Sequence, residues 1–316
     1  MKNQIKAYVV VPCYNEEAVL GETARRLTDL FGYMKRDGLI SSSSKIVFVD
    51  DGSKDKTWKI IEELTELYAE IRGIKLAHNA GHQNALFAGL MTVRDECDCA
   101  ISIDADLQDD INVIPEMLKK YRDEGCEVVY GVRNKRDTDT PFKRGTAQAF
   151  YRIMRVLGVD MVYNHADYRL MGKAALDALA EFGERNLFLR GMVPLIGYKS
   201  DCVYYERGER FAGESKYPLK KMVSFAFDGV TSFSVTPIRF ISVLGGVSCV
   251  IAVIMAVYAI VQKALGHTDT GWTSIMCSLW FIGGVQLLGM GLIGEYIGKI
   301  YKEVKHRPRY IVEKYI

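Results

Sequence analysis

Residues 7–17, AYVVVPCYNEE, pass from a short β-branched run into a polar loop and then into a helical pattern. Similar transitions recur at 45–55, KIVFVDDGSKD, and at 99–108, CAISIDADLQ. Short β-branched runs bounded by turn residues predict strands, and the longer amphipathic segments between them predict helices. This alternation predicts an α/β fold with a mostly parallel sheet and helices on both faces.

Five strands and four helices are expected from these patterns. The strands are expected at 7–11, 45–49, 74–77, 99–103 and 127–130, and the helices at 16–35, 56–71, 83–94 and 113–124. In such sheets, ligands bind outside the carboxyl ends of the strands. Side chains that perform chemistry are therefore expected in the loops that follow the strands.

Acidic and polar side chains follow three of the expected strands, at 12–17, 50–55 and 104–108. One such cluster could be a helix cap, but three at a single sheet edge predict a ligand site. Asp104 and Asp106 are alternate residues, and a turn there can aim both carboxylates into one cleft. Hard oxygen ligands of this kind suit Mg²⁺ or Mn²⁺. Such an ion would neutralise charge on a nucleoside diphosphate leaving group.

The C-terminal part of the chain has a different composition. Residues 240–262 and 270–294 contain no charged residue, and a helix of either length can cross a hydrocarbon core of roughly 30 Å. We therefore expect two transmembrane helices at about 240–262 and 271–295. The expected segments are a cytoplasmic domain at 1–216, a juxtamembrane amphipathic segment at 217–236, a membrane hairpin at 237–298 and a basic cytoplasmic tail at 299–316.

Basic residues flank the two expected spans on the outside of the hairpin. They are Lys216, Lys220, Lys221 and Arg239 before the first span, and Lys299, Lys302, Lys305, Arg307 and Arg309 after the second. The connecting loop offers Lys263 and His267 beside Asp269. Because Lys and Arg are enriched in the cytoplasmic segments that flank membrane spans, we expect a multi-pass plasma membrane protein with both termini in the cytoplasm. The net charge of +2 is small and its basic excess lies beside the membrane, so a lipid bilayer is the expected partner and a nucleic acid is not.

Two basic amphipathic segments, 142–157 and 217–233, adjoin this anchor. Each is expected either to lie in the membrane interface or to pack its apolar face on the soluble core. Gly294 and Gly298 have the GxxxG spacing of close helix packing. That spacing predicts homo-oligomerisation or packing within the hairpin.

The motifs together make the chain resemble family 2 inverting glycosyltransferases with a GT-A fold. It is most similar to the polyprenyl-phosphate glycosyltransferases, such as bactoprenol glucosyltransferases and dolichyl-phosphate mannose synthases. The matching segments are residues 11–16 (VPCYNE), 49–53 (VDDGS), 78–83 (HNAGHQ), 104–108 (DADLQ), 167–169 (DYR) and 210–217 (RFAGESKY). They cover nearly the whole chain.

The resemblance implies a role for each matching position. Pro12, Tyr14, Glu16 and Asp50 would form the pocket for the base and ribose of the donor, and Asn79, Gly81, His82 and Gln83 would close it. Asp104 and Asp106, with Gln108, would hold the metal and the diphosphate. Arg207, Arg210 and Lys216 would form a basic loop that clamps the diphosphate, since charge-assisted contacts stabilise a leaving phosphate.

On the acceptor side, the resemblance implies that Arg133, Lys143 and Arg144 face a lipid phosphate. Some relatives carry a serine four residues after the arginine, where this chain has Gln148. Asp167 matches an aspartate near the family's reaction centre. We interpret Asp167 as orienting the acceptor and its arginines, with general-base catalysis as the weaker reading and a structural ion pair with Arg169 as the simpler alternative. Asp106, Asp167 and Arg144 are the expected catalytic group.

The expected reaction is inverting transfer of a hexose, with UDP-glucose favoured as donor, to polyprenyl (undecaprenyl) phosphate. N-acetylhexosamine and mannose stay open as the sugar. A processive polysaccharide synthase is the enzymatic alternative, but its Gln-x-x-Arg-Trp motif is missing because no Trp follows an Arg here. A non-catalytic membrane scaffold with a nucleotide-binding fold is the alternative from another class.

Overall fold

A computed structural model of the chain describes residues 4–133, 165–185, 187–206, 208 and 271–316, together with isolated positions between 238 and 265. The strands are β1 (Ala7–Cys13), β2 (Lys45–Asp50), β3 (Ile71–Leu76), β4 (Cys99–Ser102), β5 (Val128–Arg133), β6 (His165–Gly172), β7 (Ser200–Tyr205) and β8 (Val312–Tyr315). The helices are α1 (Leu20–Arg36), α2 (Thr57–Leu67), α3 (His82–Val93), the short 3₁₀ helix η1 (Ile111–Val113), α4 (Ile114–Glu124), α6 (Lys173–Ala180), α7 (Leu189–Leu195) and α10 (Trp272–Val304).

The described strands form one eight-stranded mixed sheet in the order β7-β5-β6-β4-β1-β2-β3-β8. β1 pairs in parallel with both β2 and β4, so the carboxyl ends of these three strands lie at one edge. β6 is antiparallel to β4 and β5, and β8 is antiparallel to β3. The mostly parallel α/β sheet expected from the sequence is therefore confirmed, with two antiparallel strands added.

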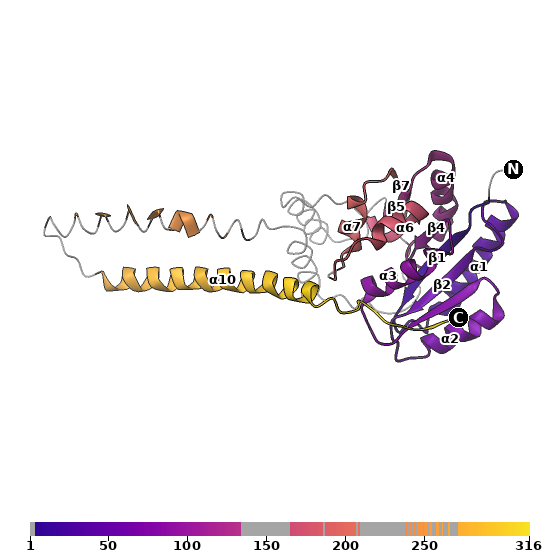
Figure 1. Cartoon of the computed structure of the whole chain (residues 1–316), viewed down its shortest axis with the longest axis horizontal. Coiled ribbons are helices and arrows are strands. Elements are labelled where there is room, and N and C mark those ends of the chain that lie inside the picture. The colour runs from indigo at the N-terminus through magenta and orange to yellow at the C-terminus, as the bar shows by residue number, and fades with distance from the viewer. Residues whose placement is uncertain are drawn as a thin grey trace.

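Alternation along β1 sends its side chains into two separate cores. Val9 and Val11 pack on one face with residues of α1, α2 and α4, whereas Tyr8 and Val10 pack on the other with residues of α3, α6 and α7. Figure 1 shows the sheet running between these helices. Strands buried on both faces need an apolar sequence on both, which explains the continuous valine run of β1.

Several expected boundaries differ from the structure, and those on either side of residue 70 show why. The helix expected at 56–71 ends at Leu67, and β3 begins at Ile71 rather than residue 74. The sequence IRGIKL places Arg72 and Lys75 among apolar residues, so it lacks the uniform apolar run by which the other strands were recognised. Gly73 lies against the last residue of the chain, where a Cβ would lie 2.6 Å from Ile61 and 3.2 Å from Ile316.

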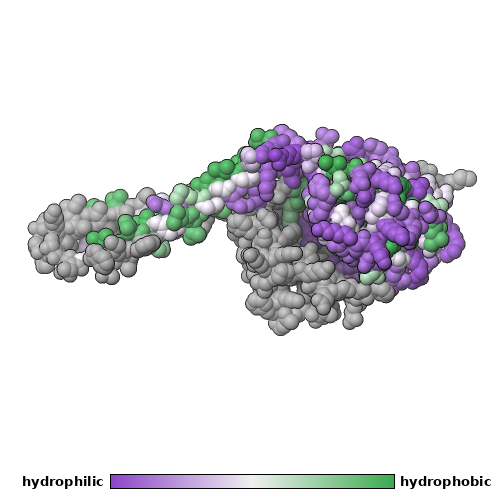
Figure 2. Space-filling view, turned by 90° about the horizontal axis from the view of Figure 1, so that it is seen from below, coloured by the Kyte–Doolittle hydropathy of each residue, from purple (hydrophilic) through white to green (hydrophobic). Residues whose placement is uncertain are grey.

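α10 projects from the domain as a long rod (Figure 1). Its 33 residues extend about 50 Å, and residues Phe281–Val304 are long and apolar enough to cross a membrane. Large apolar side chains along it, such as Leu279, Leu288 and Met290, are exposed in the protein alone. Figure 2 shows green hydrophobic residues on this rod and mostly purple hydrophilic residues on the globular domain. That division is typical of a membrane-anchored protein. The structure describes positions scattered through the first expected span, 240–262, and each of these positions is helical.

Within the expected basic tail, 299–316, residues 299–304 are the end of α10 and Val312–Tyr315 form β8. α10 continues to Val304, and β8 then pairs with β3. Gly73 and Ile316 exchange both backbone hydrogen bonds, at 3.0 and 2.9 Å. Lys314 pairs with Glu62, and Lys75 pairs with Glu313. The membrane helix is therefore followed directly by a strand of the domain's own sheet.

Candidate active site

The loops after β1 and β2 hold each other in place at the carboxyl edge of the sheet. The backbone NH of Asn15 donates to Ser53 Oγ at 3.0 Å, and the backbone NH of Lys54 donates to Asn15 Oδ1 at 2.9 Å. Asp50 is fully buried at the end of β2 and accepts a hydrogen bond from the backbone NH of Ser53. Burial raises the pKa of Asp50. The ends of β1 and β2 and the loop after β1 carry four of the predicted donor-binding residues, Pro12, Tyr14, Glu16 and Asp50.

The loop after β2 also binds the loop that leads into α3. Asp51 accepts hydrogen bonds from the backbone NH of Ala80 at 2.6 Å and of Gly81 at 3.0 Å. Gly52 has φ +65°, and a Cβ there would lie 2.6 Å from the backbone nitrogen of Asn79. Glycine is required at this turn because any side chain would push the two loops apart. The contact fixes the start of α3, which carries His82 and Gln83.

Asp104 and Asp106 follow β4, at the same edge. Asp104 Oδ1 is shielded from solvent and receives no hydrogen bond from the described residues, while the imidazole Nε2 of His82 lies 3.5 Å away. Burial raises the pKa of Asp104. Asp106 Oδ1 accepts the backbone NH of Gln108, across a turn in which Leu107 has φ +56°. A buried carboxylate oxygen without a hydrogen-bond donor fits a divalent cation, which prefers such ligands.

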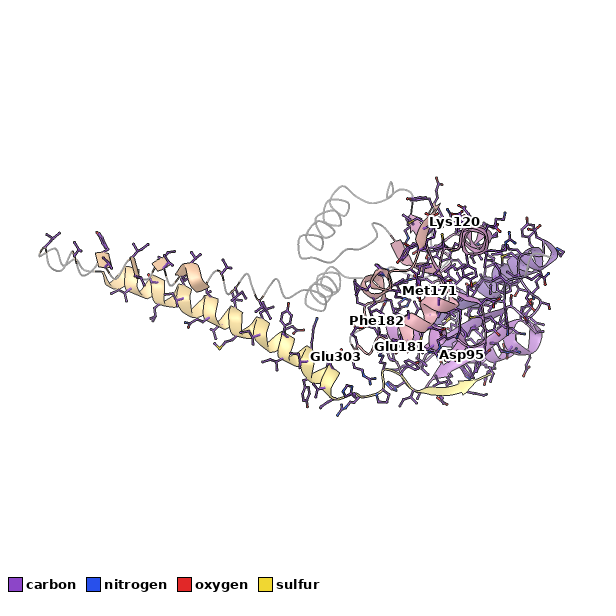
Figure 3. The ribbon with its side chains drawn as sticks, turned by 45° about the horizontal axis from the view of Figure 1, so that its top comes forward. Asp95, Lys120, Met171, Glu181, Phe182 and Glu303 are labelled. Carbon is purple, nitrogen blue, oxygen red and sulfur yellow. The ribbon has the colours of Figure 1, made fainter. Side chains whose placement is uncertain are left out.

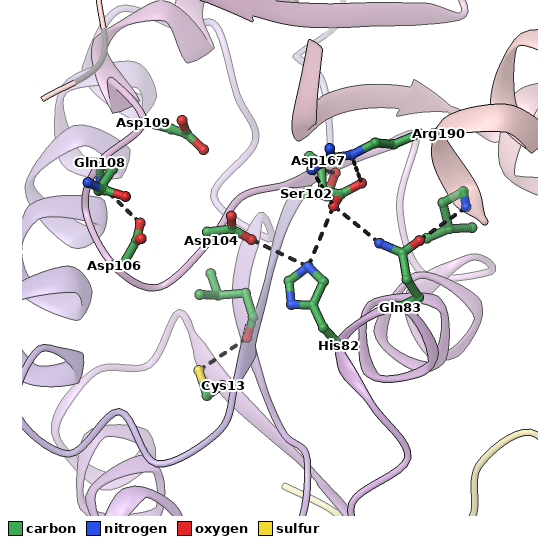
Figure 4. Close-up of polar contacts among 12 residues, drawn as sticks. Cys13, His82, Gln83, Ser102, Asp104, Asp106, Gln108, Asp109, Asp167 and Arg190 are labelled. Atoms are coloured by element: carbon green, nitrogen blue, oxygen red, sulfur yellow. Dashed lines mark hydrogen bonds and ion pairs between the residues drawn. The ribbon is translucent and has the colours of Figure 1, made fainter. Parts of the chain in front are cut away.

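His82 lies between two carboxylates that come from different strands (Figure 4). Its Nε2 is 3.5 Å from Asp104 Oδ1 and 3.7 Å from Asp167 Oδ2. Desolvation lowers the pKa of His82, but the hydrogen bond to Asp167 and the charge of Asp104 outweigh it and raise the pKa to about 9. His82 therefore links the loop after β4 to β6.

Asp167 on β6 is the centre of a dense polar cluster (Figure 4). Its side chain is 6% exposed, and its Oδ1 accepts hydrogen bonds from Arg169 at 2.6 Å and from Arg190 Nε at 3.3 Å. Its Oδ2 accepts Arg190 Nη2 at 3.1 Å and Gln83 Nε2 at 3.2 Å. Burial alone would raise the pKa of Asp167, but Arg190, His82 and Arg169 together hold it well below its usual range.

An ionised carboxylate with both oxygens already bonded is a poor general base. The orienting interpretation of Asp167 is therefore favoured over base catalysis. The structural ion pair with Arg169 is also present, since Arg169 is buried and donates to both Asp167 and the carbonyl of Leu189. The ion pair with Arg169 and an orienting role are compatible, because different donors occupy the same carboxylate.

Arg190 on α7 belongs to this cluster and was missed in the sequence. α7 has only seven residues and contains Pro194, so it gives no periodic signal that would draw attention to one arginine. Gln83 also reaches α7, because its Oε1 accepts the backbone NH of Leu189 at 3.1 Å. Three elements, α3, β6 and α7, therefore meet at Asp167.

The family model for glycosyl transferase family 2 matches residues 8–180, which includes every element of this cluster except α7. The chain belongs to glycosyl transferase family 2. A second family model, the GtrB C-terminal hairpin, matches residues 236–300. The GT-A-like sheet, the family assignment and the glycosyltransferase activity predicted from the sequence are confirmed.

Relatives of this glycosyltransferase match it along almost its whole length. The uncharacterized glycosyltransferase YkoT of Bacillus subtilis is 56% identical over 305 residues, which cover 96% of this chain and 90% of the relative. The SfII prophage-derived bactoprenol glucosyl transferase of Shigella flexneri is 38% identical over 315 residues and 98% of both chains. The solved structure of glucosyl-3-phosphoglycerate synthase of Mycobacterium tuberculosis, with Mn²⁺, UDP and glucosyl-3-phosphoglycerate, matches 72% of this chain and 78% of its own, with a TM-score of 0.45 and 16% identity.

Arg133, predicted to meet a lipid phosphate in this glycosyltransferase, pairs with Asp109 in the structure. Its Nη2 donates to Asp109 Oδ1 at 3.0 Å, and its Nε donates to the hydroxyl of Tyr205 at 3.3 Å. Tyr205 donates to the same Asp109 oxygen at 2.6 Å. Burial would lower the pKa of Arg133, but Asp109 and Tyr205 raise it. The guanidinium is therefore a fixed cation beside the loop of Asp104 and Asp106.

The other predicted cations of the glycosyltransferase, Lys143, Arg144, Arg207, Arg210 and Lys216, and also Gln148, lie outside the described residues. The backbone NH of Gly208 donates to the carbonyl of Gln108 at 2.9 Å, so the start of the predicted clamp segment contacts the loop of Asp104 and Asp106. A hollow of about 700 Å³ lies behind that loop, against Arg25, Arg26 and Gly208. Its lining includes Gln108 and Asp109 but neither Asp104 nor Asp167, so it is not the place where those carboxylates act.

The arrangement can bind a metal-linked diphosphate on one side of His82 and a second anion on the other. Asp104 faces the imidazole from the loop after β4, and the Asp167–Arg190 pair faces it from β6 and α7. Two anionic ligands held next to each other suit a displacement in which one phosphate attacks the anomeric carbon of a sugar and the diphosphate departs from that carbon.

Proposed function

We propose that this glycosyltransferase moves glucose from UDP-glucose to a polyprenyl phosphate of the undecaprenyl class, with inversion at the anomeric carbon. The observation that carries the proposal is full-length similarity to bactoprenol glucosyl transferases, at 38% identity over 98% of the Shigella flexneri protein. A prophage homologue of that enzyme in Escherichia coli is 36% identical over 98% of this chain. The similarity includes both the sugar-transfer domain and the C-terminal hairpin.

The chemistry of the acceptor suits a site without a strong general base. A phosphate monoester has a second pKa near 6 and is largely ionised at neutral pH, so it can attack the anomeric carbon itself. What the protein must supply is orientation and compensation of charge. His82 and the Asp167–Arg190 pair are placed to do this on one side, and the loop of Asp104 and Asp106 on the other.

Asp104 and Asp106, with Gln108, would hold Mg²⁺ or Mn²⁺. Such an ion supplies charge neutralisation on the departing nucleoside diphosphate. The chain's own contribution there is the turn at Leu107, which fixes Asp106 through its bond to the backbone of Gln108. Pro12, Tyr14, Glu16 and Asp50 would hold the nucleoside, and Arg207, Arg210 and Lys216 would close over the diphosphate.

The test is transfer from a panel of radiolabelled nucleotide sugars to undecaprenyl phosphate. Purified full-length protein is incubated with Mg²⁺ or Mn²⁺ and one donor at a time, and label is counted in the organic phase. We expect label from UDP-glucose and a loss of it with EDTA. Label from UDP-N-acetylhexosamine or GDP-mannose instead would correct the donor. No transfer from any donor, by protein that still binds UDP, would favour a scaffold.

We also propose that the transfer domain and both termini lie in the cytoplasm, with two membrane crossings between them. Support comes from β8, because its pairing with β3 joins the residues after α10 to the same sheet that precedes the anchor. A chain that leaves a domain and returns to it must cross the membrane an even number of times. The basic residues beside both ends of the hairpin favour the cytoplasmic side.

This topology predicts the behaviour of reporter fusions in Escherichia coli. Alkaline phosphatase fused after Ile316 should be inactive, and green fluorescent protein at the same point should fluoresce. Phosphatase inserted after His267 should be active, because that loop is expected outside the membrane. Active phosphatase at both sites, or at Ile316 alone, would contradict the topology.

A further inference from the structure

Arg190 is held by Asp167 from one edge of its guanidinium. Hydrogen bonds run from Nε to Oδ1 at 3.3 Å and from Nη2 to Oδ2 at 3.1 Å, so the Nε edge faces the carboxylate. The side chain keeps 32% of its surface exposed, whereas Asp167 is 6% exposed. A buried anion thus fixes a cation at the surface of the site (Figure 4).

The segment that carries Arg190 is tied to the end of the membrane helix. The carboxylate of Glu303, at the end of α10, accepts the backbone NH of Arg185 at 2.7 and 2.8 Å. The guanidinium of Arg185 donates to the carbonyl of His306 at 3.2 Å. Figure 3 shows Glu303 beside the loop that follows Phe182. α7 begins four residues after Arg185, on the side of the domain from which α10 extends (Figure 1).

The ion-paired groups at Asp167 carry a net positive charge. Arg169 and Arg190 both donate to Asp167, so two guanidinium groups share one carboxylate. Two cations against one carboxylate leave an excess of one positive charge. A guanidinium presents a fork of N–H donors that matches two phosphate oxygens.

We propose that Arg190 binds the phosphate of the lipid acceptor and that Asp167 is the positioning residue that orients it. The proposal rests on the proposed function, because it assigns a residue to the acceptor of that reaction. The donor is the other source of phosphate in the site. Arg190 and Asp104 lie on opposite sides of His82, and the segment before α7 is hydrogen-bonded to the end of α10. Arg190 therefore binds the phosphate of the lipid rather than that of the donor.

The experiment measures binding rather than transfer, on full-length protein in detergent. Fluorescent farnesyl phosphate and the matching farnesol are titrated against wild type, Arg190→Ala and Arg190→Lys, and UDP with Mn²⁺ is titrated separately. For Arg190→Ala we expect farnesyl phosphate to bind about 10- to 100-fold more weakly, as for a lost charge-assisted bond. Farnesol and UDP should bind as in wild type. Lysine should restore part of the phosphate binding, since it keeps the charge without the fork.

Arg94→Ala is the matched control, because Arg94 is 33% exposed and pairs with Asp95 and Asp177 away from the site. It should leave all three affinities unchanged. If Arg190→Ala bound farnesyl phosphate and farnesol equally weakly, the proposal would be overturned in favour of a structural role. The same would follow if Arg190→Ala lowered the melting temperature and Arg190→Lys restored both the melting temperature and the binding of both ligands. Weakened UDP binding with unchanged lipid binding would overturn it in favour of the donor phosphate. If wild type binds phosphate and alcohol equally, the acceptor of the proposed function is wrong as well.

Discussion

Asp104→Asn is expected to lower sugar transfer by about 1000-fold while the protein stays folded. The substitution keeps the shape of the side chain and removes the charge that a divalent cation needs. A 1000-fold loss corresponds to about 4 kcal/mol of transition-state stabilisation, a size that metal compensation of a leaving diphosphate can supply. Stability should change little, because Asp104 Oδ1 accepts no hydrogen bond from the described residues and desolvation disfavours its charge, which offsets the loss of its 3.5 Å ion pair with His82. The measurement is transfer to undecaprenyl phosphate beside Mn²⁺ affinity and melting temperature.

Asp110→Asn is the control for that substitution. Asp110 lies in the same loop, where its Oδ1 accepts the backbone NH of Asn112 at the start of η1. Asparagine can still cap this turn, so transfer should stay within about twofold of wild type. If Asp104→Asn kept more than a tenth of the wild-type rate with its EDTA sensitivity intact, Asp104 would not be a metal ligand.

The first half of the fold could be predicted because its signals are local. Each of the parallel strands β1, β2 and β4 is a short apolar run followed by polar residues, and the structure places all three carboxyl ends at one edge. Asp104 could likewise be recognised from its place after a buried strand. Its proximity to Asp167, through His82, needed the resemblance, because 63 residues separate the two aspartates and no pattern links them.

The antiparallel strands could not be predicted from periodicity. β6 contains Asp167 and the fully buried Arg169, so it does not read as an apolar strand. β8 is exposed along its length and pairs with β3, more than 230 residues earlier in the chain. Arg190 was missed for a related reason. Its role depends on the contact of three elements at one carboxylate, and the sequence of a seven-residue helix does not indicate such a contact.

Asp167→Ala is expected to destabilise the domain as well as to abolish transfer. It would leave Arg169, which is 2% exposed at its side chain, buried without its carboxylate. Removing one partner of a buried ion pair typically costs about 3–5 kcal/mol. At roughly 2–4 °C per kcal/mol for a domain of this size, the melting temperature should fall by about 10 °C. Asp201→Ala, which removes the partner of the more exposed Lys120, should cost under about 1 kcal/mol.

The double variant Asp167→Leu with Arg169→Met separates the two roles of the carboxylate. An apolar pair of similar volume can replace a buried ion pair at little cost in stability. The melting temperature of the double variant should therefore be close to that of wild type. Transfer should not return, because Arg190, Gln83 and His82 would all still lack the oxygens that orient them. If stability and transfer recovered together, Asp167 would be a structural residue and nothing more. If neither single nor double variant changed the melting temperature by more than about 2 °C, the buried pair would not stabilise the domain.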